Sequence, residues 1–223
     1  MYVLVNFCLE FMPRTKLRKI LAVDALPNVF QRPPENGDWL HEFFGNPKPF
    51  TLEVGCGRGD YAIHLAQARP NANFVGVDMK GARLWTGAQT AIALDIRNVA
   101  FLRASARDLH EYFGEGEVEE IWIPFPDPLP TKKGIARRLI APRFLEVYRK
   151  ILRPGGKVHL KTDDEAFFEF TIQTLSEQDI AIIRSTEDIY AEKYKGIVTA
   201  IKTKYEERHL AEGKKIKYVC FVL

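Results

Sequence analysis

The segment IWIPFPDPLPTKK, residues 121–133, holds one carboxylate, Asp127, among prolines at every second position from Pro124 to Pro130. Each proline fixes its own φ at about −65°, lacks an N–H donor and restricts the preceding residue to extended conformations. We therefore expect a stiff, extended loop that is neither a helix nor a central strand. Such a loop could simply end a strand, or it could hold Asp127 in one place against a ligand.

A second candidate for chemistry is LEVGCGRGDY, residues 52–61, in which Gly55, Gly57 and Gly59 alternate with other residues. Glycine is required where a chain turns sharply from strand to helix and where a ligand approaches the backbone. Asp78 follows nineteen residues after Gly59, at the end of the next apolar segment. A carboxylate there can accept hydrogen bonds from both hydroxyls of an adenosine ribose, so the pattern predicts a nucleoside site.

Glu53, two residues before the first glycine, indicates which nucleoside derivative fits. A carboxylate at this place would repel the pyrophosphate of a dinucleotide, but it would attract the amino group of a methionine moiety. Asp60 also stands where the nicotinamide-binding pattern has glycine or alanine. We therefore favour S-adenosylmethionine, which has no phosphate and carries a positive sulfonium, over NAD and an oxidoreductase.

The segments that would position these residues alternate between strand and helix patterns. We predict strands at 50–54, 73–78, 99–103, 119–123 and 157–162, and two late strands at 180–185 and 215–223. We predict helices at 61–68, 81–94, 106–113, 142–152 and 163–178, with a break at 153–157. The alternation predicts an α/β fold with a mostly parallel, doubly wound sheet and one antiparallel late strand. Ligands bind beyond the carboxyl ends of such strands, where Asp127 and Asp163 would lie.

Length and composition limit the classes of protein that this chain can be. Its 223 residues, 46% of them hydrophobic, fit one domain, which we place at 47–223 behind an N-terminal arm at 1–46. Residues 1–11 could be an upstream extension before the more conventional start at Met12. The apolar runs are shorter than the roughly 20 residues of a membrane span. Three cysteines without CxxC spacing and scattered histidines indicate a cytoplasmic protein without a metal site.

Charge is distributed unevenly along the chain, although the net charge is only +3. Eight lysines and arginines lie between Thr131 and Arg153, and six carboxylates without a base lie between Asp108 and Glu120. Separation of this kind predicts a basic face for a polyanion such as RNA, whereas for any single cluster the alternative is ordinary solvated surface. The arm around PRTKLRKILAV could close over RNA or could pack as an amphipathic helix.

These features together resemble the tRNA (guanine-N7)-methyltransferases of the bacterial single-chain type. The resemblance covers residues 14–221 and rests on LEVGCGRG, NFVGVD, PFPDP, ARRLIAPRFLEVYRKILRPGGKVHLKTDDE and TKYEERHLAEGKKIKY. It implies the Rossmann-like fold of class I S-adenosylmethionine-dependent methyltransferases. It also implies that the substrate is a guanosine in the variable loop of tRNA.

The resemblance assigns roles to individual residues. Cofactor contacts would fall on Glu53, Gly55, Gly57, Gly59, Asp78, Ser105 and Asp127. Guanine and tRNA contacts would fall on Lys132, Lys133, Asp163, Thr203, Lys204, Tyr205 and Glu206, and the basic cluster adds Arg137 and Arg138. Two positions depart from the family's pattern. Ser105 replaces its usual acid, and Thr131 replaces a lysine whose part Lys132 or Lys133 would have to take.

The expected chemistry needs no general base, since N7 of guanine presents an in-plane lone pair that can attack the sulfonium methyl group directly. The product purine is cationic, so fixed carboxylates from Asp127 and Asp163 would favour the transition state. The same two residues, which we regard as catalytic, could accept hydrogen bonds from N1–H and the amino group of guanine.

Two other functions remain open from the sequence. An amino-group methyltransferase acting on adenine or cytosine also carries a loop after its fourth strand, but it needs an aromatic residue that this loop lacks at its end. A catalytically silent RNA-binding module is the second alternative, and binding of S-adenosylmethionine would separate it. Trp122 and His159, both in predicted strands, are expected to be core residues.

Overall fold

A computed structural model describes residues 15–31 and 39–223 apart from 193 and 195, so the expectation for residues 1–11 lies outside the described chain. The strands are β1 (Val29–Phe30), β2 (Phe50–Val54), β3 (Asn73–Val77), β4 (Val99–Leu102), β5 (Val118–Pro124), β6 (Leu152–Thr162), β7 (Ile182–Thr186) and β8 (Lys217–Val222). The helices are α2 (Thr15–Ala22), α3 (Trp39–Phe44), α4 (Asp60–Ala68), α5 (Gly81–Ala93), α6 (Lys132–Ile135), α7 (Pro142–Ile151), α8 (Glu165–Glu177), α9 (Ile197–Ala200) and α10 (Lys204–Ala211). Two 3-10 turns are η1 (Val23–Ala25) and η2 (Leu109–Glu111). No helix of the described residues is long and apolar enough to span a bilayer.

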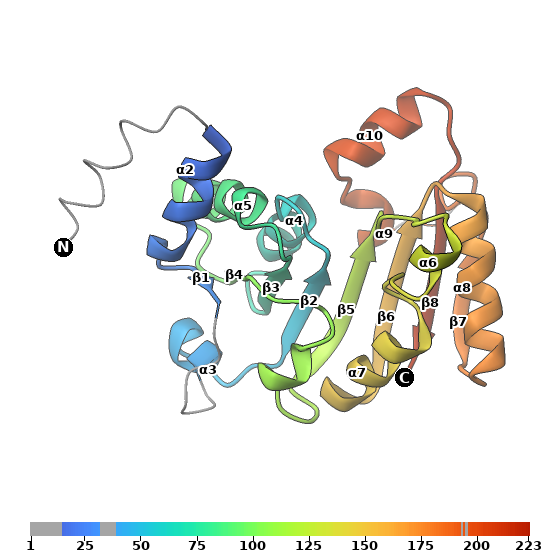
Figure 1. Cartoon of the computed structure of the whole chain (residues 1–223), viewed down its shortest axis with the longest axis horizontal. Helices are drawn as coiled ribbons and strands as arrows, with labels where there is room; N and C mark the ends of the chain where they lie inside the picture. Colours follow the sequence, from blue (N-terminus) through green and yellow to red (C-terminus); the bar gives the residue numbers. More distant parts are fainter. Residues whose placement is uncertain (1–14, 32–38, 193, 195) are drawn as a thin grey trace.

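The described strands form one sheet in the order β1-β4-β3-β2-β5-β6-β8-β7. The pairs from β1 through β6 are parallel, and β8 runs antiparallel to both of its neighbours (Figure 1). Leu52 of β2 lies opposite Val75 of β3 and Ile121 of β5, so these three strands end at the same edge. The predicted fold class, a mostly parallel sheet with one antiparallel late strand, is confirmed.

Alternation along the strands sends side chains to two cores, one on each face of the sheet. Ile121 and Ile123 belong to the core under α3, α7 and α8, whereas Trp122 belongs to the core under α4 and α5. Trp122 stacks on His159 with ring centroids 4.1 Å apart, and both side chains are buried. The expectation that these two residues belong to the core is confirmed.

The described part of residues 1–46 is joined to the sheet. β1 pairs in parallel with β4 at the sheet edge. Helix α2 packs on α5, where Lys19 Nζ donates a hydrogen bond to Thr86 Oγ1 (3.1 Å) and lies 4.8 Å from the centroid of the Trp85 ring. The helix thus packs against the domain, on α5 and not on the sheet itself, and its closure over RNA stays a prediction.

Two local predictions are wrong. Residues 106–113 form only the short turn η2, because Ser105 Oγ and the Ser105 carbonyl accept hydrogen bonds from the N–H groups of Arg107 and Asp108 and fold a local turn. The expected break at 153–157 lies inside β6. There, Gly155 has a φ of 75°, and the pairing with β5 shifts register between Val118 and Glu120, so a bulge takes up the extra residues.

Candidate active site

The glycine loop between β2 and α4 has the conformation that its spacing predicted. Gly55, Gly57 and Gly59 have φ values of 78°, 58° and 66°, a region that side chains with a Cβ rarely adopt. A Cβ at Gly59 would lie 2.3 Å from Cε1 of Phe101, whereas one at Gly57 would meet nothing within 4 Å. The loop is therefore tightly packed at Gly59 and open at Gly57, where a ligand can approach its backbone.

Asp78, just beyond β3, is held in one orientation beside this opening. Its Oδ2 accepts a hydrogen bond from the N–H of Gly57 (2.9 Å), and its Oδ1 accepts one from the N–H of Lys80 (2.8 Å). Each carboxylate oxygen has a second lone pair. The carboxylate can therefore keep both backbone contacts while it accepts further hydrogen bonds from a ligand.

Glu53, in β2, is a buried acid at the base of the same loop. Its Oε2 accepts a hydrogen bond from the N–H of Ala62 in the first turn of α4 (2.7 Å). Burial raises the pKa of Glu53 to about 8; the Ala62 hydrogen bond opposes this, and the charges of Asp60 and Asp78 add to it. A cationic group bound next to Glu53 would offset the cost of burying the charged carboxylate, so the site favours an ammonium ligand.

Helix α5 supports the glycine loop from behind, through a residue that sequence reasoning did not single out. A Cβ at Gly87 would lie 2.2 Å from the carbonyl oxygen of Arg58, so only glycine allows this approach of helix and loop. In sequence, Gly87 is an isolated glycine in a helical pattern, which by itself does not reveal its contact.

The proline loop after β5 is fastened at both ends. The N–H of Phe125 donates to the carbonyl of Lys161 in β6 (2.8 Å), and the carbonyl of Pro128 accepts from Arg138 Nε (2.8 Å). Phe125 and Leu129 have positive φ values of 52° and 46°, which is costly for residues with side chains and persists only where the surroundings impose it. The predicted stiff loop is thus observed, with two sharp backbone turns in it.

Asp127 stands at the exposed middle of this loop. Its side chain is 78% exposed, and Oδ2 lies 3.9 Å from Nζ of Lys80, which follows β3. The carboxylate therefore faces the segment after Asp78 across the opening between β2 and β5, as the sequence predicted.

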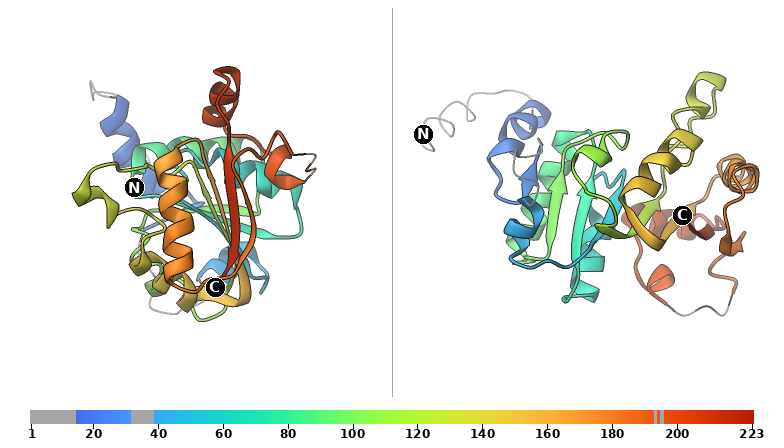
Figure 2. Two further views of the ribbon diagram at one scale, coloured as in Figure 1. Left: turned by 90° about the vertical axis from the view of Figure 1, so that its right-hand side faces the viewer. Right: turned by 90° about the horizontal axis from the view of Figure 1, so that it is seen from below.

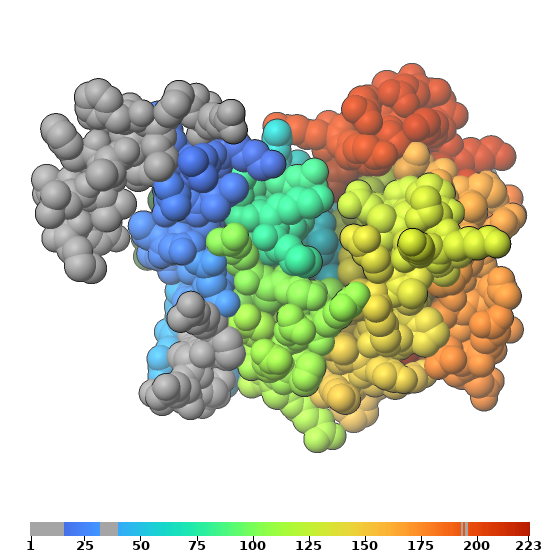
Figure 3. Space-filling view, viewed as in Figure 1, coloured from blue at the N-terminus to red at the C-terminus, as the bar shows by residue number. Residues whose placement is uncertain are grey.

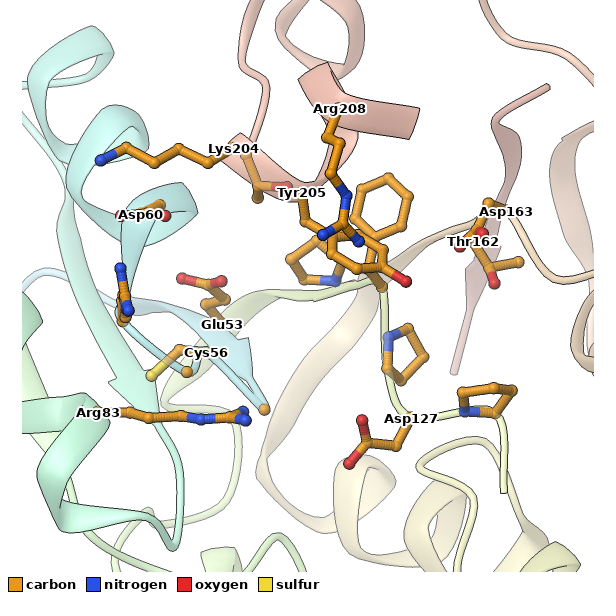
Figure 4. Close-up of a pocket in the computed structure, with 18 of the residues that line it drawn as sticks. Glu53, Cys56, Asp60, Arg83, Asp127, Thr162, Asp163, Lys204, Tyr205 and Arg208 are labelled. Carbon is orange, nitrogen blue, oxygen red and sulfur yellow. The ribbon is translucent and has the colours of Figure 1, made fainter. Parts of the chain in front are cut away.

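A cleft of about 720 Å³ lies between the glycine loop, the proline loop and α10 (Figures 3 and 4). It is lined by Glu53, Gly55, Cys56, Gly57, Arg58, Asp60, Arg83, 124–128, 162–164, 203–205 and Arg208. Arg83 and Arg208 were missed from the sequence, where they are single charges on helices. Both residues line the cleft only because the fold brings α5 and α10 to the same edge of the sheet. Helix α10 lies beyond the carboxyl ends of β5 and β6 (Figures 1 and 2).

Asp163 reaches the cleft from the end of β6 rather than from the proline loop (Figure 4). Its Oδ2 lies 2.8 Å from Nδ1 of the buried His209 and 3.4 Å from Nζ of Lys214. The side chain is 19% exposed. One oxygen of Asp163 is thus committed to the α10 region, whereas the exposed carboxylate of Asp127 has, among the described residues, a single distant contact, with Lys80.

The first turn of α10 forms the rim of the cleft. Thr203 caps the helix, its Oγ1 accepting from the N–H of Glu206 (3.1 Å), while Lys204 is exposed. The half-exposed ring of Tyr205 lies 5.4 Å from that of Phe125, and the Arg208 guanidinium lies 5.0 Å from its centroid. The rim therefore offers aromatic surface and positive charge together.

Glu206 is a correction to the predicted substrate residues. Its side chain is fully buried, forms an ion pair with Lys161 and accepts a hydrogen bond from the hydroxyl of Tyr190 (2.7 Å). A carboxylate with these partners has no surface to offer a substrate. It holds α10 on the sheet, and the residues before it in the TKYE motif face the cleft.

Arg138 is a second correction. It is only 5% exposed, donates to the Pro128 carbonyl and lies 4.5 Å from the ring centroid of Phe170, so it braces the proline loop. Its neighbour Arg137 is exposed, as are Lys132 and Lys133 in α6. Thr131 caps α6 by accepting from the N–H of Gly134 (3.2 Å), which accounts for a hydroxyl residue at that position.

The side chain of Ser105 is committed to its own loop, because its Oγ accepts a hydrogen bond from the N–H of Arg107 (3.2 Å). Of the predicted cofactor residues, Gly59, Asp78 and Ser105 are not among those that line the cleft. A contact between Ser105 and a cofactor stays a prediction.

Comparison with known proteins identifies the family of the chain. A family model described as a putative methyltransferase matches residues 47–219. A protein named tRNA (guanine-N(7)-)-methyltransferase from Bacteroides thetaiotaomicron is 39% identical over 221 residues, which are 95% of this chain and 87% of that protein. One of the same name from Cytophaga hutchinsonii is 40% identical over 217 residues, which are 94% of this chain and 98% of that protein.

Solved structures repeat the fold at much lower identity. The 16S rRNA methyltransferase KamB has a TM-score of 0.61 at 15% identity, with 82% of this chain and 92% of that chain covered. An antibiotic-related methyltransferase has a TM-score of 0.62 at 19% identity, with 85% and 94% covered. At these identities the likeness shows the fold alone.

The family match over residues 47–219 and the names of the relatives define an S-adenosylmethionine-dependent methyltransferase, and the cleft lies beyond the carboxyl ends of the strands, where such a sheet binds its ligands. The match over nearly the whole length at 39–40% identity is more specific. The chain belongs to the tRNA (guanine-N7)-methyltransferase family.

Proposed function

We propose that this protein transfers the methyl group of S-adenosylmethionine to N7 of a guanosine in tRNA, in the variable loop by resemblance to its family. The observation that carries the proposal is Asp127, an exposed carboxylate on a stiff loop that faces the glycine loop across the cleft. The names of its similar relatives support the same substrate.

The residues around the glycine loop fit the methyl donor, which when bound supplies a methyl group activated by its sulfonium. Asp78 would accept from the ribose hydroxyls while keeping its contact to Gly57. Glu53 would pair with the ammonium of the methionine moiety, and this pairing would lower its raised pKa. Gly57, with open space where a Cβ would point, leaves room for the nucleoside.

The guanine would lie between the proline loop and α10. Aromatic rings stack on unpaired bases in RNA recognition, and Tyr205 and Phe125 provide such a surface. N7 needs no deprotonation before it attacks, so the work of the site is alignment and charge stabilisation. Asp127 would stabilise the positive charge that develops on the purine. Asp163, whose Oδ2 accepts a hydrogen bond from Lys214 Nζ, would accept from the guanine edge through Oδ1.

Basic side chains on both sides of the cleft would contact the RNA backbone. Lys132, Lys133 and Arg137 lie on the α6 side, and Lys204 and Arg208 lie on the α10 side. Contacts of this kind position a large substrate without reading its sequence.

The proposal is tested by incubating the protein with methyl-labelled S-adenosylmethionine and unmodified tRNA. The product is then mapped by the chain cleavage that is specific for N7-methylguanosine. We expect label in the tRNA and cleavage at one guanosine. Label on an exocyclic amino group, or donor binding without transfer, would contradict the proposal and favour an amino-group methyltransferase or a silent RNA-binding module.

A further inference from the structure

Arg143, in the first turn of α7, has an arrangement that folding alone does not explain. Nε and Nη2 of its guanidinium are shielded from solvent, and neither has a hydrogen-bond partner among the described residues. The guanidinium lies 4.8 Å from the ring centroid of Phe144, and the residue as a whole is half-buried. Shielded N–H donors are normally paired with an acceptor, so Nε and Nη2 carry an uncompensated cost.

The neighbours of Arg143 increase that cost instead of relieving it. Burial, together with the positive charges of Arg107 and Arg137, lowers the pKa of Arg143. Arg107 precedes η2, which packs against α7, and Arg137 follows α6. Both are exposed, and within the described residues none of the three arginines forms an ion pair. Three separate segments thus bring like charges close enough to one another to lower the pKa of Arg143.

The position of this cluster relates it to the cleft. Leu139, four residues before Arg143, has its Cδ1 3.2 Å from the place where a Cβ of Gly55 would stand. The segment that leads into α7 therefore touches the glycine loop, and Arg137 lies on the side of the proline loop that carries Lys132 and Lys133.

We propose that Arg107, Arg137 and Arg143 form a binding site for one backbone phosphate of the tRNA. The inference rests on the proposed function, because a tRNA substrate is what brings a phosphodiester to this face. Guanidinium groups suit phosphate through charge and paired N–H donors, and a bound phosphate would supply the negative charge and the acceptors that the cluster lacks. Arg107 and Arg143 are thereby assigned to substrate binding, at a site separate from the glycine loop and the proline loop.

The site is tested with three single variants, Arg143→Gln, Arg107→Gln and, as a control, Arg149→Gln. Arg149 is exposed on the same helix, six residues further on, so its replacement changes the net charge equally. The dissociation constant of unmodified tRNA is measured at several salt concentrations. We expect the first two variants to weaken binding about tenfold and to reduce the slope of log affinity against log salt by about one, as loss of a phosphate contact predicts. The control should leave the slope unchanged, and all three should keep the wild-type affinity for S-adenosylmethionine.

Thermal unfolding without tRNA separates a binding role from a structural one. Since Arg143 is an unpaired charge among like charges, Arg143→Gln should melt at or above the wild-type temperature. A lower melting temperature with an unchanged salt slope would make Arg143 structural and overturn the proposal. Equal effects of Arg143→Gln and Arg149→Gln on tRNA binding would overturn the proposal as well. So would thermal stabilisation of the wild type by inorganic phosphate combined with normal tRNA binding by Arg143→Gln and Arg107→Gln. If wild type fails to methylate tRNA at N7, the proposed function fails. If wild type methylates tRNA and the slope does not respond, only the phosphate site fails.

Discussion

The ammonium of Lys161, in β6, forms an ion pair with the carboxylate of Glu206, in α10, and both side chains are fully buried. Lys161 Nζ also donates to the carbonyl of Val198 (2.8 Å), and the backbone carbonyl of Lys161 accepts from the N–H of Phe125 (2.8 Å). One residue therefore ties the rim helix and the proline loop to the same strand.

Replacing Lys161 by methionine should lower the free energy of unfolding by about 3–5 kcal/mol, because it leaves Glu206 as an unpaired buried charge. The double variant Lys161→Met, Glu206→Gln removes both charges and should recover part of that loss. Denaturant unfolding of the wild type, both single variants and the double variant provides the coupling energy. A double variant no more stable than Lys161→Met would show that the pair does not act as argued.

Asp127→Asn should reduce the rate of methyl transfer in a single turnover by roughly 100-fold or more, the scale expected for removing a preorganised charge at the reacting atoms. The dissociation constant of tRNA should stay within about threefold, because one exposed carboxylate contributes little to binding a polyanion. Asp95→Asn, which removes an exposed acid paired with Arg97, is the matched control. Equal losses in rate and affinity would assign Asp127 to binding instead.

The raised pKa of Glu53 predicts a pH dependence of stability. Its pKa is about 8 in the folded protein and 4.5 in the ordinary case, so between these values the folded state binds one more proton than the unfolded state. The stability that this group contributes is therefore complete below pH 4.5 and is lost as the pH rises towards 8, by roughly 5 kcal/mol in total. Glu53→Gln should lack this decline. Urea unfolding of both proteins from pH 5 to 8 tests the sign, and parallel profiles would refute it.

The adjacent residues Arg137 and Arg138 should behave differently. Arg137→Gln should weaken tRNA binding and flatten its salt dependence, with little change in thermal stability. Arg138→Gln should lower the melting temperature and the transfer rate, because the Pro128 carbonyl loses its donor and the proline loop is released. Filter binding, thermal unfolding and single-turnover rates are compared for the pair. If the two variants behaved alike in all three measurements, the assignment of tRNA binding to Arg137 and of loop support to Arg138 would be contradicted.

Gly87→Ala should impair the cofactor site from outside the cleft. The new Cβ would lie 2.2 Å from the Arg58 carbonyl, and backbone cannot yield as a flexible side chain does. We expect at least a tenfold weaker affinity for S-adenosylmethionine and a loss of about 1–3 kcal/mol in stability. Calorimetric titration measures the first. Gly114→Ala, where a Cβ would meet nothing closer than 3.4 Å, should be nearly neutral.

The sheet and the two loops could be predicted because each depends on a local pattern. The apolar runs give β2 to β5 within one or two residues, and glycine and proline restrict their own backbone wherever they occur. The same reasoning placed Asp78 and Asp127 beyond the carboxyl ends of β3 and β5, the two strands that flank β2. The turn at Ser105 departed because the serine side chain and carbonyl accept local hydrogen bonds, and the expected break at 153–157 departed because a bulge with Gly155 at positive φ carries β6 through it.

Side-chain roles at long range could not be read in the same way. Arg137 and Arg138 are identical in sequence, and only the fold decides that the second reaches the Pro128 carbonyl. Glu206 pairs with Lys161, which lies 45 residues earlier in the sequence, in a segment whose apolar pattern predicts only a strand of the core. A charged side chain is buried where it has a partner of opposite charge, and here only the tertiary structure brings that partner close.

Two of the segments that bound the cleft are far apart in sequence, residues 53–83 and residues 203–208. The first contains the end of β2, the glycine loop, α4 and β3 and reaches into α5, whereas the second comes late, just before the antiparallel strand β8. We propose that the first receives the methyl donor and the second meets the RNA, so that evolution can revise one without disturbing the other. Exchange of the last third of the chain between relatives would be a direct way to transplant substrate preference.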